Sequence, residues 1–198
     1  MTYGFEARNS SGELVIDGEY PVEVLNVEKT ITGTLYSTGI YEFSFPPTNT
    51  IRFWKMSVGD VVTQYPSGFL CNKSSFTVRE SIPVSQSPAP SGYGMVVYDA
   101  SGNRVFQADQ ETASIGDRFT VQANIGSSPQ IDANTSDEWI HLTDWNISVI
   151  TVSTSFAIVL SGGVKRDTSS KYVHAGEEYA TGPNGPNFSR PTTFVTMK

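Results

Sequence analysis

The chain has few of the residues that catalytic centres and disulfide-stapled folds use. Among its 198 residues there are one cysteine and two histidines, and charged residues make up 17%. A single cysteine, Cys71, excludes an internal disulfide and any zinc site built from several cysteines. We expect Cys71 to be a small buried side chain. The two histidines, His141 and His174, lie in no cysteine-protease or metal-binding motif.

Cations and long apolar runs are also scarce. Lys and Arg number 13 against 20 Asp and Glu, which gives a net charge of −7 and a pI near 4.8. Nucleic-acid-binding domains are usually basic, so we predict no nucleic-acid partner. The longest apolar stretch, residues 147–160, is shorter than the roughly 20 residues of a membrane helix, so we predict no membrane insertion. Residues 1–6 show no signal-peptide pattern, and we therefore expect synthesis in the cytoplasm.

Aromatic residues are plentiful. The chain has 11 Phe, 9 Tyr and 3 Trp. Disordered chains are poor in aromatics and rich in charge, whereas this composition is typical of an ordered protein with a buried core. A chain of this length fits one large or two small domains.

Alternation of apolar and polar residues, interrupted by turn residues, recurs along the whole chain. This period of two is typical of strands, and no window shows the spacing of an amphipathic helix. The alternating segments are residues 30–36, 41–45, 50–56, 61–65, 75–82, 118–123 and 139–143. Residues 147–160 form a further β segment whose alternation changes phase near 150–151, which predicts a β-bulge or a sharp bend there. We therefore predict an all-β protein.

Proline and glycine mark the predicted boundaries. A tract rich in Pro and Ser covers residues 83–92, and because proline lacks a backbone donor we expect a linker there. A second turn-rich tract begins near residue 181. The sequence thus predicts two β-sandwich-like or small-barrel modules. Their bounds are an N-terminal β domain at 1–82, the linker at 83–92, a C-terminal β domain at 93–180 and an extended arm at 181–198.

An internal repeat joins the two halves. Residues 3–15 recur without gaps at 93–105 as Tyr-Gly, a short strand, Asn or Asp, a small residue, Ser-Gly and a second strand. This pattern predicts a duplicated β-hairpin. In each copy Asn9 or Asp99 caps the turn, and Gly12 or Gly102 supplies a positive φ. The two hairpins fit either separate domains or one common fold.

The repeated phrase resembles the Tyr-Gly-Leu-x-Val-x-Asn-x-x-Gly-x-x-x-x-Asp opening of small tail proteins of tailed bacteriophages and prophages. The resemblance covers residues 3–17 and 92–107, and the second copy departs from it with Gln107 in place of Asp17. It implies a virion component near the tail tip, made in the host cytoplasm, with other tail proteins as partners and a homo-oligomeric state. The family offers no catalytic residues to carry over.

Motifs for common chemistry are missing from the sequence. There is no Gly-x-Ser-x-Gly elbow, P-loop, dinucleotide fingerprint or His-Glu-x-x-His helix, and we predict neither an enzyme nor a bound cofactor or metal. Residues 132–138 are rich in the oxygen ligands that calcium prefers. However, Asp137 stands where an EF-hand requires glycine and Thr143 where it requires glutamate, so we interpret the segment as a polar loop.

The candidate ligand-contact residues are Trp139, Trp145 and Asp137. Indole rings stack on sugars, and a glycoside hydrolase would need two carboxylates across the sugar ring, for which Glu138 and Asp144 are also near in sequence. The alternative is that both tryptophans are core residues, because large aromatics dominate core burial.

Three functions remain open from the sequence. The leading hypothesis is a structural subunit of a phage tail or tail tip, held by protein–protein contacts and strand-edge pairing, with 83–92 and 188–198 as candidate contact segments. The second is a virion module that binds a glycan or protein on the host surface. The third, a depolymerase or wall hydrolase, lacks a catalytic constellation.

Overall fold

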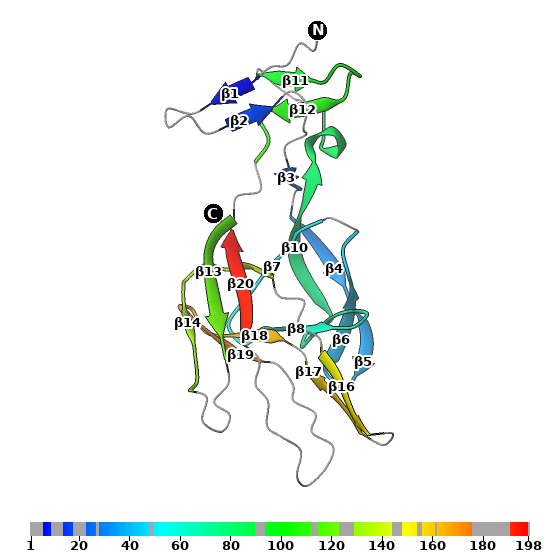
Figure 1. The fold of residues 1–198 in the computed structure, drawn as a ribbon, viewed down its shortest axis with the longest axis vertical. Coiled ribbons are helices and arrows are strands. Elements are labelled where there is room, and N and C mark those ends of the chain that lie inside the picture. Colours follow the sequence, from blue (N-terminus) through cyan, green and yellow to red (C-terminus); the bar gives the residue numbers. More distant parts are fainter. Residues whose placement is uncertain are drawn as a thin grey trace. The chain divides into compact units, whose positions relative to one another are not determined.

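The chain folds into two compact units that are interleaved along the sequence (Figure 1). The computed structural model describes residues 6–8, 14–17, 23–26, 28–47, 50–89, 94–111, 115–122, 129–143, 148–153, 156–160, 162–175 and 191–197. Unit 1 comprises Met1–Glu28, Thr48–Arg52 and Arg79–Ser114, and unit 2 comprises Lys29–Pro47, Phe53–Val78 and Ile115–Lys198. These units differ from the consecutive domains 1–82 and 93–180 predicted from composition, because long-range strand pairing joins segments far apart in sequence.

Two antiparallel sheets make up most of unit 2. In the first sheet β20 lies between β13 and β15, β7 follows β15, β10 follows β7, and β4 also pairs with β10. The bounds are β13 Ile115–Val121, β20 Thr192–Met197, β15 Trp139–Leu142, β7 Arg52–Lys55, β10 Ser75–Pro83 and β4 Lys29–Thr32. Strands β7 and β10 each contain residues of both units.

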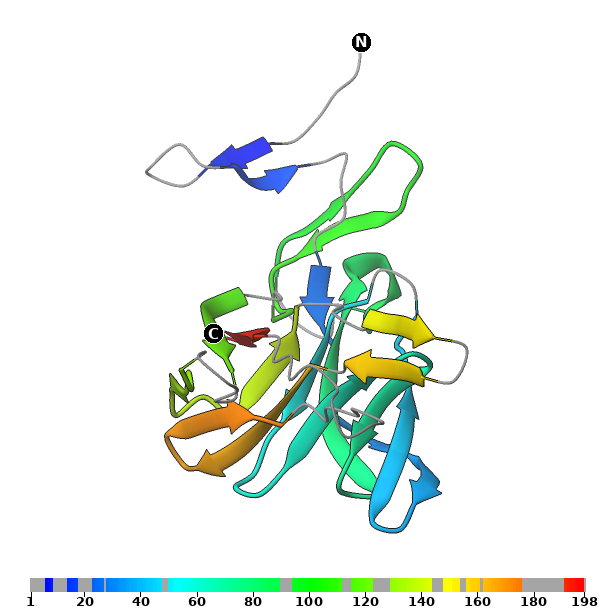
Figure 2. The same ribbon diagram turned by 60° about the horizontal axis from the view of Figure 1, so that its bottom comes forward.

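The second sheet of unit 2 has seven strands in the order β14-β19-β18-β8-β9-β6-β5. Their bounds are β14 Ala133–Asn134, β19 Lys171–His174, β18 Gly163–Thr168, β8 Val61–Tyr65, β9 Gly68–Cys71, β6 Ile40–Ser44 and β5 Thr34–Ser37. Every pairing in it is antiparallel. Turning the molecule shows β4 and β5, in blue, at the rim of this unit (Figure 2).

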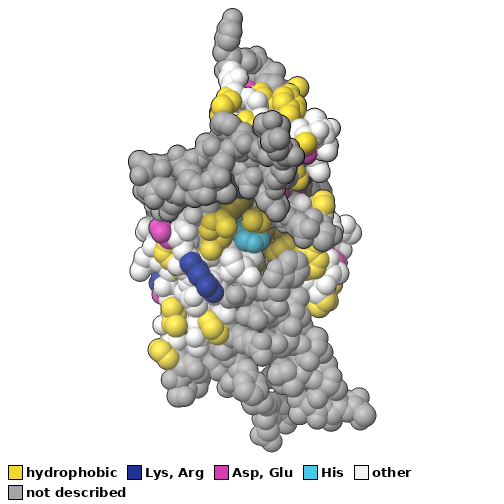
Figure 3. All heavy atoms as spheres, turned by 45° about the horizontal axis from the view of Figure 1, so that its top comes forward, with side chains coloured by type: hydrophobic (Ala, Val, Ile, Leu, Met, Phe, Trp, Pro, Cys, Tyr) yellow, Lys and Arg dark blue, Asp and Glu magenta, His cyan; other side chains and the backbone are white. Residues whose placement is uncertain are grey.

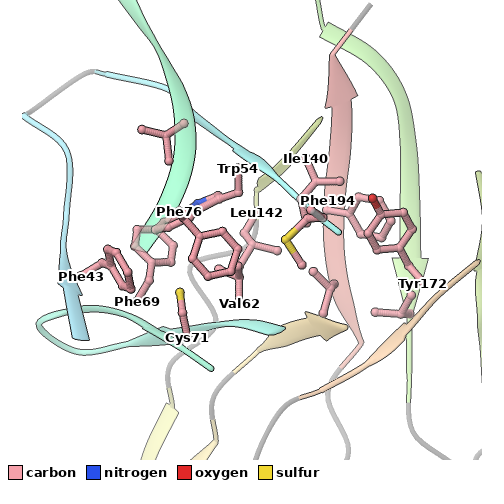
Figure 4. Packing of buried hydrophobic residues seen from close by; sticks show 14 of the residues in the cluster. Phe43, Trp54, Val62, Phe69, Cys71, Phe76, Ile140, Leu142, Tyr172 and Phe194 are labelled. Atoms are coloured by element: carbon pink, nitrogen blue, oxygen red, sulfur yellow. The ribbon is translucent and has the colours of Figure 1, made fainter. Parts of the chain in front are cut away.

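The core of unit 2 consists of side chains that the strands of both sheets contribute (Figure 4). Trp54 of β7, Phe43 of β6 and Phe76 of β10 are at most 3% exposed. Their rings meet edge to face, at 5.6 Å and 89° for Phe43 and Trp54 and at 5.5 Å and 85° for Trp54 and Phe76. Each such pair stabilises the fold by about 0.5–1.5 kcal/mol in addition to the free energy gained by burying the rings. The predicted all-β, sandwich-like fold is thus confirmed, and Cys71 is buried as expected.

Two glycines pack directly against Phe43. A Cβ at Gly68 would lie 2.0 Å from the Phe43 carbonyl oxygen, and a Cβ at Gly33 would lie 2.6 Å from Cε2 of the Phe43 ring. Gly33 separates β4 from β5 and donates its N–H to the Ser74 carbonyl at 2.9 Å. The segment predicted as one strand over 30–36 is therefore divided at Gly33, so that β4 pairs in one sheet and β5 in the other.

Residues 148–160 form a hairpin of β16 (Ser148–Ser153) and β17 (Phe156–Leu160), with a register irregularity between Thr151 and Ser153. The sequence predicted one β segment with a bulge or a sharp bend near 150–151. Paired residues of β16 and β17 have the same parity, as in Ser148↔Leu160 and Ile150↔Ile158, so the alternation alone does not mark the change of direction.

Two hairpins of unit 1 carry the internal repeat. β1 (Glu6–Arg8) pairs with β2 (Leu14–Asp17), and β11 (Val96–Tyr98) pairs with β12 (Arg104–Gln107). Every paired position of the first hairpin recurs 90 residues later in the second. For example, Glu6↔Asp17 corresponds to Val96↔Gln107, and the register shift before Arg8 corresponds to the one before Tyr98. The duplicated hairpin predicted from the sequence is confirmed in its backbone pairing.

Asp99 caps the turn of the second hairpin as predicted. Its Oδ1 accepts the backbone N–H groups of Ser101 and Asn103, both at 2.8 Å, and Gly102 has a φ of 82°. The pKa of the Asp99 carboxyl is held below its ordinary value, chiefly because the Asn103 side chain donates a hydrogen bond to it. The corresponding turn of the first hairpin, with Asn9 and Gly12, lies outside the described residues.

The start of the Pro- and Ser-rich tract is tied to unit 1 by Arg104. Pro83 is the last residue of β10 and pairs with Glu23 of β3 (Glu23–Leu25), and Val84–Gln86 forms the 3₁₀ turn η1. Arg104 donates to the Val84 and Pro88 carbonyls, each at 2.9 Å. Over residues 83–89 the tract expected to be a linker is therefore anchored by hydrogen bonds.

In place of an extended arm, Thr192–Met197 forms β20, and five of its six residues are buried. The sequence did not indicate this strand because its partners, β13 and β15, are remote in sequence. Residues 176–190 lie outside the described part of the chain. In the residues that the structure describes, no helix is long and apolar enough to cross a membrane.

We expect Gly68→Ala to lower the free energy of unfolding by about 3 kcal/mol, because the new Cβ collides with the Phe43 carbonyl and the backbone must shift. Urea unfolding followed by tryptophan fluorescence measures this change. Gly94→Ala is the matched control, because its Cβ would lie 3.8 Å from the Ala108 Cβ, an ordinary contact. Equal stability of the two variants would contradict the packing described here.

Candidate functional site

Asp137 lies in a loop whose backbone is held by hydrogen bonds. Its carbonyl accepts the Tyr172 hydroxyl at 2.6 Å, and its N–H donates to Thr135 Oγ1 at 3.2 Å. Burial raises the pKa of Tyr172 far above its usual range, so its hydroxyl remains a donor at neutral pH. The contacts found for Asp137 thus run through its main chain.

Arg166 holds the same loop from β18. Its guanidinium donates to the carbonyls of Ser136 at 3.2 Å and Ser169 at 2.9 Å, and to that of Met56. Nη1 also lies 3.3 Å from Oε1 of Glu138. Arg166 is only 4% exposed. A buried guanidinium requires this density of acceptors, so Arg166 fixes the loop that leads into β15.

Trp139 begins β15 and is half-buried. It pairs in register with Lys55 of β7, whose ammonium lies 5.3 Å from the centre of an indole ring. A cation over the ring uses the same π-face on which a sugar would stack. Trp145, the other tryptophan predicted as a ligand contact, lies outside the described residues. Trp54, in contrast, is fully buried in the core.

The oxygen-rich segment 132–138 is partly a strand. Ala133 and Asn134 form β14, and Asp132 pairs with Lys171 at 2.8 Å. The Lys171 ammonium, followed by the Gln130 amide, lowers the pKa of Asp132. An ammonium therefore already neutralises the first carboxylate of the calcium candidate. Across the described ranges, no group of three or more His, Cys, Asp or Glu side chains could hold a metal ion.

One surface that the sequence did not single out is the strand edge formed by β4, Gly33 and β5, which we call the β4–β5 edge. Every residue of β5 is exposed, with Leu35 at 64% and Tyr36 at 49%. Within the part of the chain that the structure describes, β5 pairs with β6 alone and ends its sheet. Residues 29–37 contain one charged side chain, that of Lys29.

A pair of tyrosines stands beside this edge. The Tyr36 and Tyr65 hydroxyls are 2.7 Å apart, and the two rings meet at 66° with centroids 5.3 Å apart. The hydrogen bond with Tyr36 is the main reason that the pKa of Tyr65 is raised. On neighbouring β6, Glu42 accepts a hydrogen bond from Ser67. Two aromatic rings that hydrogen-bond and pack on each other therefore lie beside the edge. Tyrosine side chains are common at protein interfaces because they combine an apolar ring with a polar hydroxyl.

A contact between two rings joins β7 and β15. The ring centroids of Phe53 and His141 are 5.8 Å apart, and Phe53 is fully buried. The face of the molecule drawn in Figure 3 shows hydrophobic side chains gathered around a histidine. The His141 imidazole thus packs beside the buried ring of Phe53.

Comparisons of the chain with protein-family models, with curated proteins and with solved structures found no match. The described residues include an exposed strand edge, a tyrosine pair and a loop held by Arg166, and each of these could contact another molecule.

We expect Arg166→Met to lower the free energy of unfolding by about 3 kcal/mol, because the carbonyls of Met56, Ser136 and Ser169 lose their donor. Chemical denaturation measures the loss. Lys165→Met is the control: its pair with Asp167 is exposed, and such pairs contribute at most about 1 kcal/mol. A stability of Arg166→Met equal to that of this control would refute the anchoring role of Arg166.

Proposed function

We propose that the chain is a structural, non-enzymatic component of a bacteriophage tail or tail tip that assembles through protein–protein contacts. The observation that carries the proposal is the β4–β5 edge, a strand edge that is exposed and nearly free of charge. The phage context comes from the resemblance of the repeated hairpin to tail proteins.

The chemistry of the edge supports binding by strand addition. An edge strand presents unpaired N–H and C=O groups, and proteins that avoid pairing protect such strands with charges, prolines or very short lengths. Residues 30–37 contain no charge and no proline. Exposed Leu35 and Tyr36 add apolar area to the main-chain hydrogen bonds that an incoming strand would form.

Particles of the phage or prophage that encodes the chain provide the test. We expect the wild-type protein in purified tails, located by immunogold labelling, and about tenfold less of a Leu35→Lys variant, because a buried unpaired charge opposes strand addition. Val58→Lys is the control, since Val58 is equally exposed, at 58%, but lies outside the edge. Protein abundant in the lysate yet missing from tails would refute the proposal.

The second candidate function is recognition of a host-surface glycan. The observation that favours it is the grouping of Tyr36 and Tyr65 with the Glu42 carboxylate and Ser67, because aromatic rings and carboxylates together suit sugar rings and hydroxyls. We expect glycan-array binding that Tyr65→Ala lowers at least tenfold and that Val58→Lys leaves unchanged. Binding that instead depends on Trp139 would move the glycan site to β15.

A further inference from the structure

The two ends of the seven-stranded sheet differ in their ability to accept another strand. At one end β5 offers four uncharged residues, Thr34–Ser37, all exposed. At the other end β14 has two residues, and the Asp132–Lys171 ion pair flanks it. A head-to-tail chain of subunits would need both ends, and a two-residue strand next to an ion pair is a poor partner. Pairing at this sheet is therefore favoured between like ends.

We propose that a second copy of this chain binds at β5, antiparallel to it across a two-fold axis, so that the two seven-stranded sheets become one. This inference rests on the proposed function and specifies its partner. In an isologous contact each residue meets the same surface from the other copy, which penalises any charge near the axis. Thr34, Leu35, Tyr36 and Ser37 carry none.

The charge of the whole chain restricts where two copies can meet. At a net charge of −7 the copies repel each other, so a self-contact is favoured at a surface without carboxylates. Residues 29–37 contain no acidic side chain, and their single charge is the cation Lys29. The edge strand itself can therefore approach its own copy without bringing carboxylates together; the Glu42 carboxylate lies one strand inward, on β6 opposite Thr34, and accepts a hydrogen bond from Ser67.

The edge is held in place before binding, which lowers the entropy cost of association. The Phe43 ring packs on Gly33, the Gly33 N–H bonds to Ser74, and the Tyr36 hydroxyl bonds to Tyr65. A register irregularity between Leu35 and Ser37 limits the straight portion of the strand. An interface this short belongs to the small, weak class, and we expect a dissociation constant on the order of 10 µM.

Sedimentation equilibrium of the full chain tests the inference. The protein is loaded at concentrations up to about twenty times the expected dissociation constant, and over this range the wild type is expected to form a reversible dimer. Leu35→Lys and Leu35→Glu should each be monomeric, because like charges meet near the axis, whereas an equimolar mixture of the two should restore dimers. Val58→Lys is the control and should dimerise like the wild type, and circular dichroism checks that each variant is folded.

A wild type that stays monomeric over this range would overturn the inference, as would dimers that both Leu35 variants retain. Failure of the mixture to dimerise would overturn the two-fold arrangement. These results are distinguishable from failure of the proposed function, which is judged by the presence of the chain in purified tails. A monomer that still incorporates into tails refutes the self-pairing alone.

Discussion

Close packing around the Phe43 side chain determines the geometry of the β-sandwich. The Phe43 ring meets Trp54 and Phe76 edge to face, while its carbonyl lies against Gly68 and its ring covers Gly33. Because a Cβ at either glycine would be too close, the two backbones approach Phe43 more closely than any other residue would allow. The division of residues 29–37 between two sheets follows from this approach, and with it the exposed edge that carries the proposed function.

Arginine side chains in both units hold neighbouring segments together, and two of these arginines bind segments that lack regular pairing. Arg166 binds carbonyls of the loop before β15, and Arg104 binds those of the Pro- and Ser-rich tract. Arg52, in unit 1, is paired with Glu80 at 2.7 Å, and both side chains are at most 7% exposed. The planar fork of donors can satisfy several carbonyls at once, which a lysine cannot do. Irregular backbone in these segments is thereby held by hydrogen bonds to side chains.

The sequence predicted the local elements well and the long-range ones poorly. The alternation of Ile140 and Leu142, the hairpin register and the Asp99 cap depend on neighbouring residues, and the structure agrees with each. β20 and the interleaved units depend on pairing between remote segments, which one sequence does not encode visibly. Of the site, Asp137 and Trp139 were named from their types, but the Tyr36–Tyr65 pair requires knowledge of which strands meet.

The position of β20 has a consequence for the order of events during protein synthesis. β13 and β15 do not pair with each other; each pairs with β20, which begins 50 positions after the end of β15. While the ribosome is still translating the intervening stretch, the first sheet therefore has a gap, and Phe119 and Leu142 lack their neighbour Phe194. A nascent chain in this condition exposes strand edges and apolar side chains, so chaperones that bind extended apolar segments have a window in which to act before residue 197 emerges.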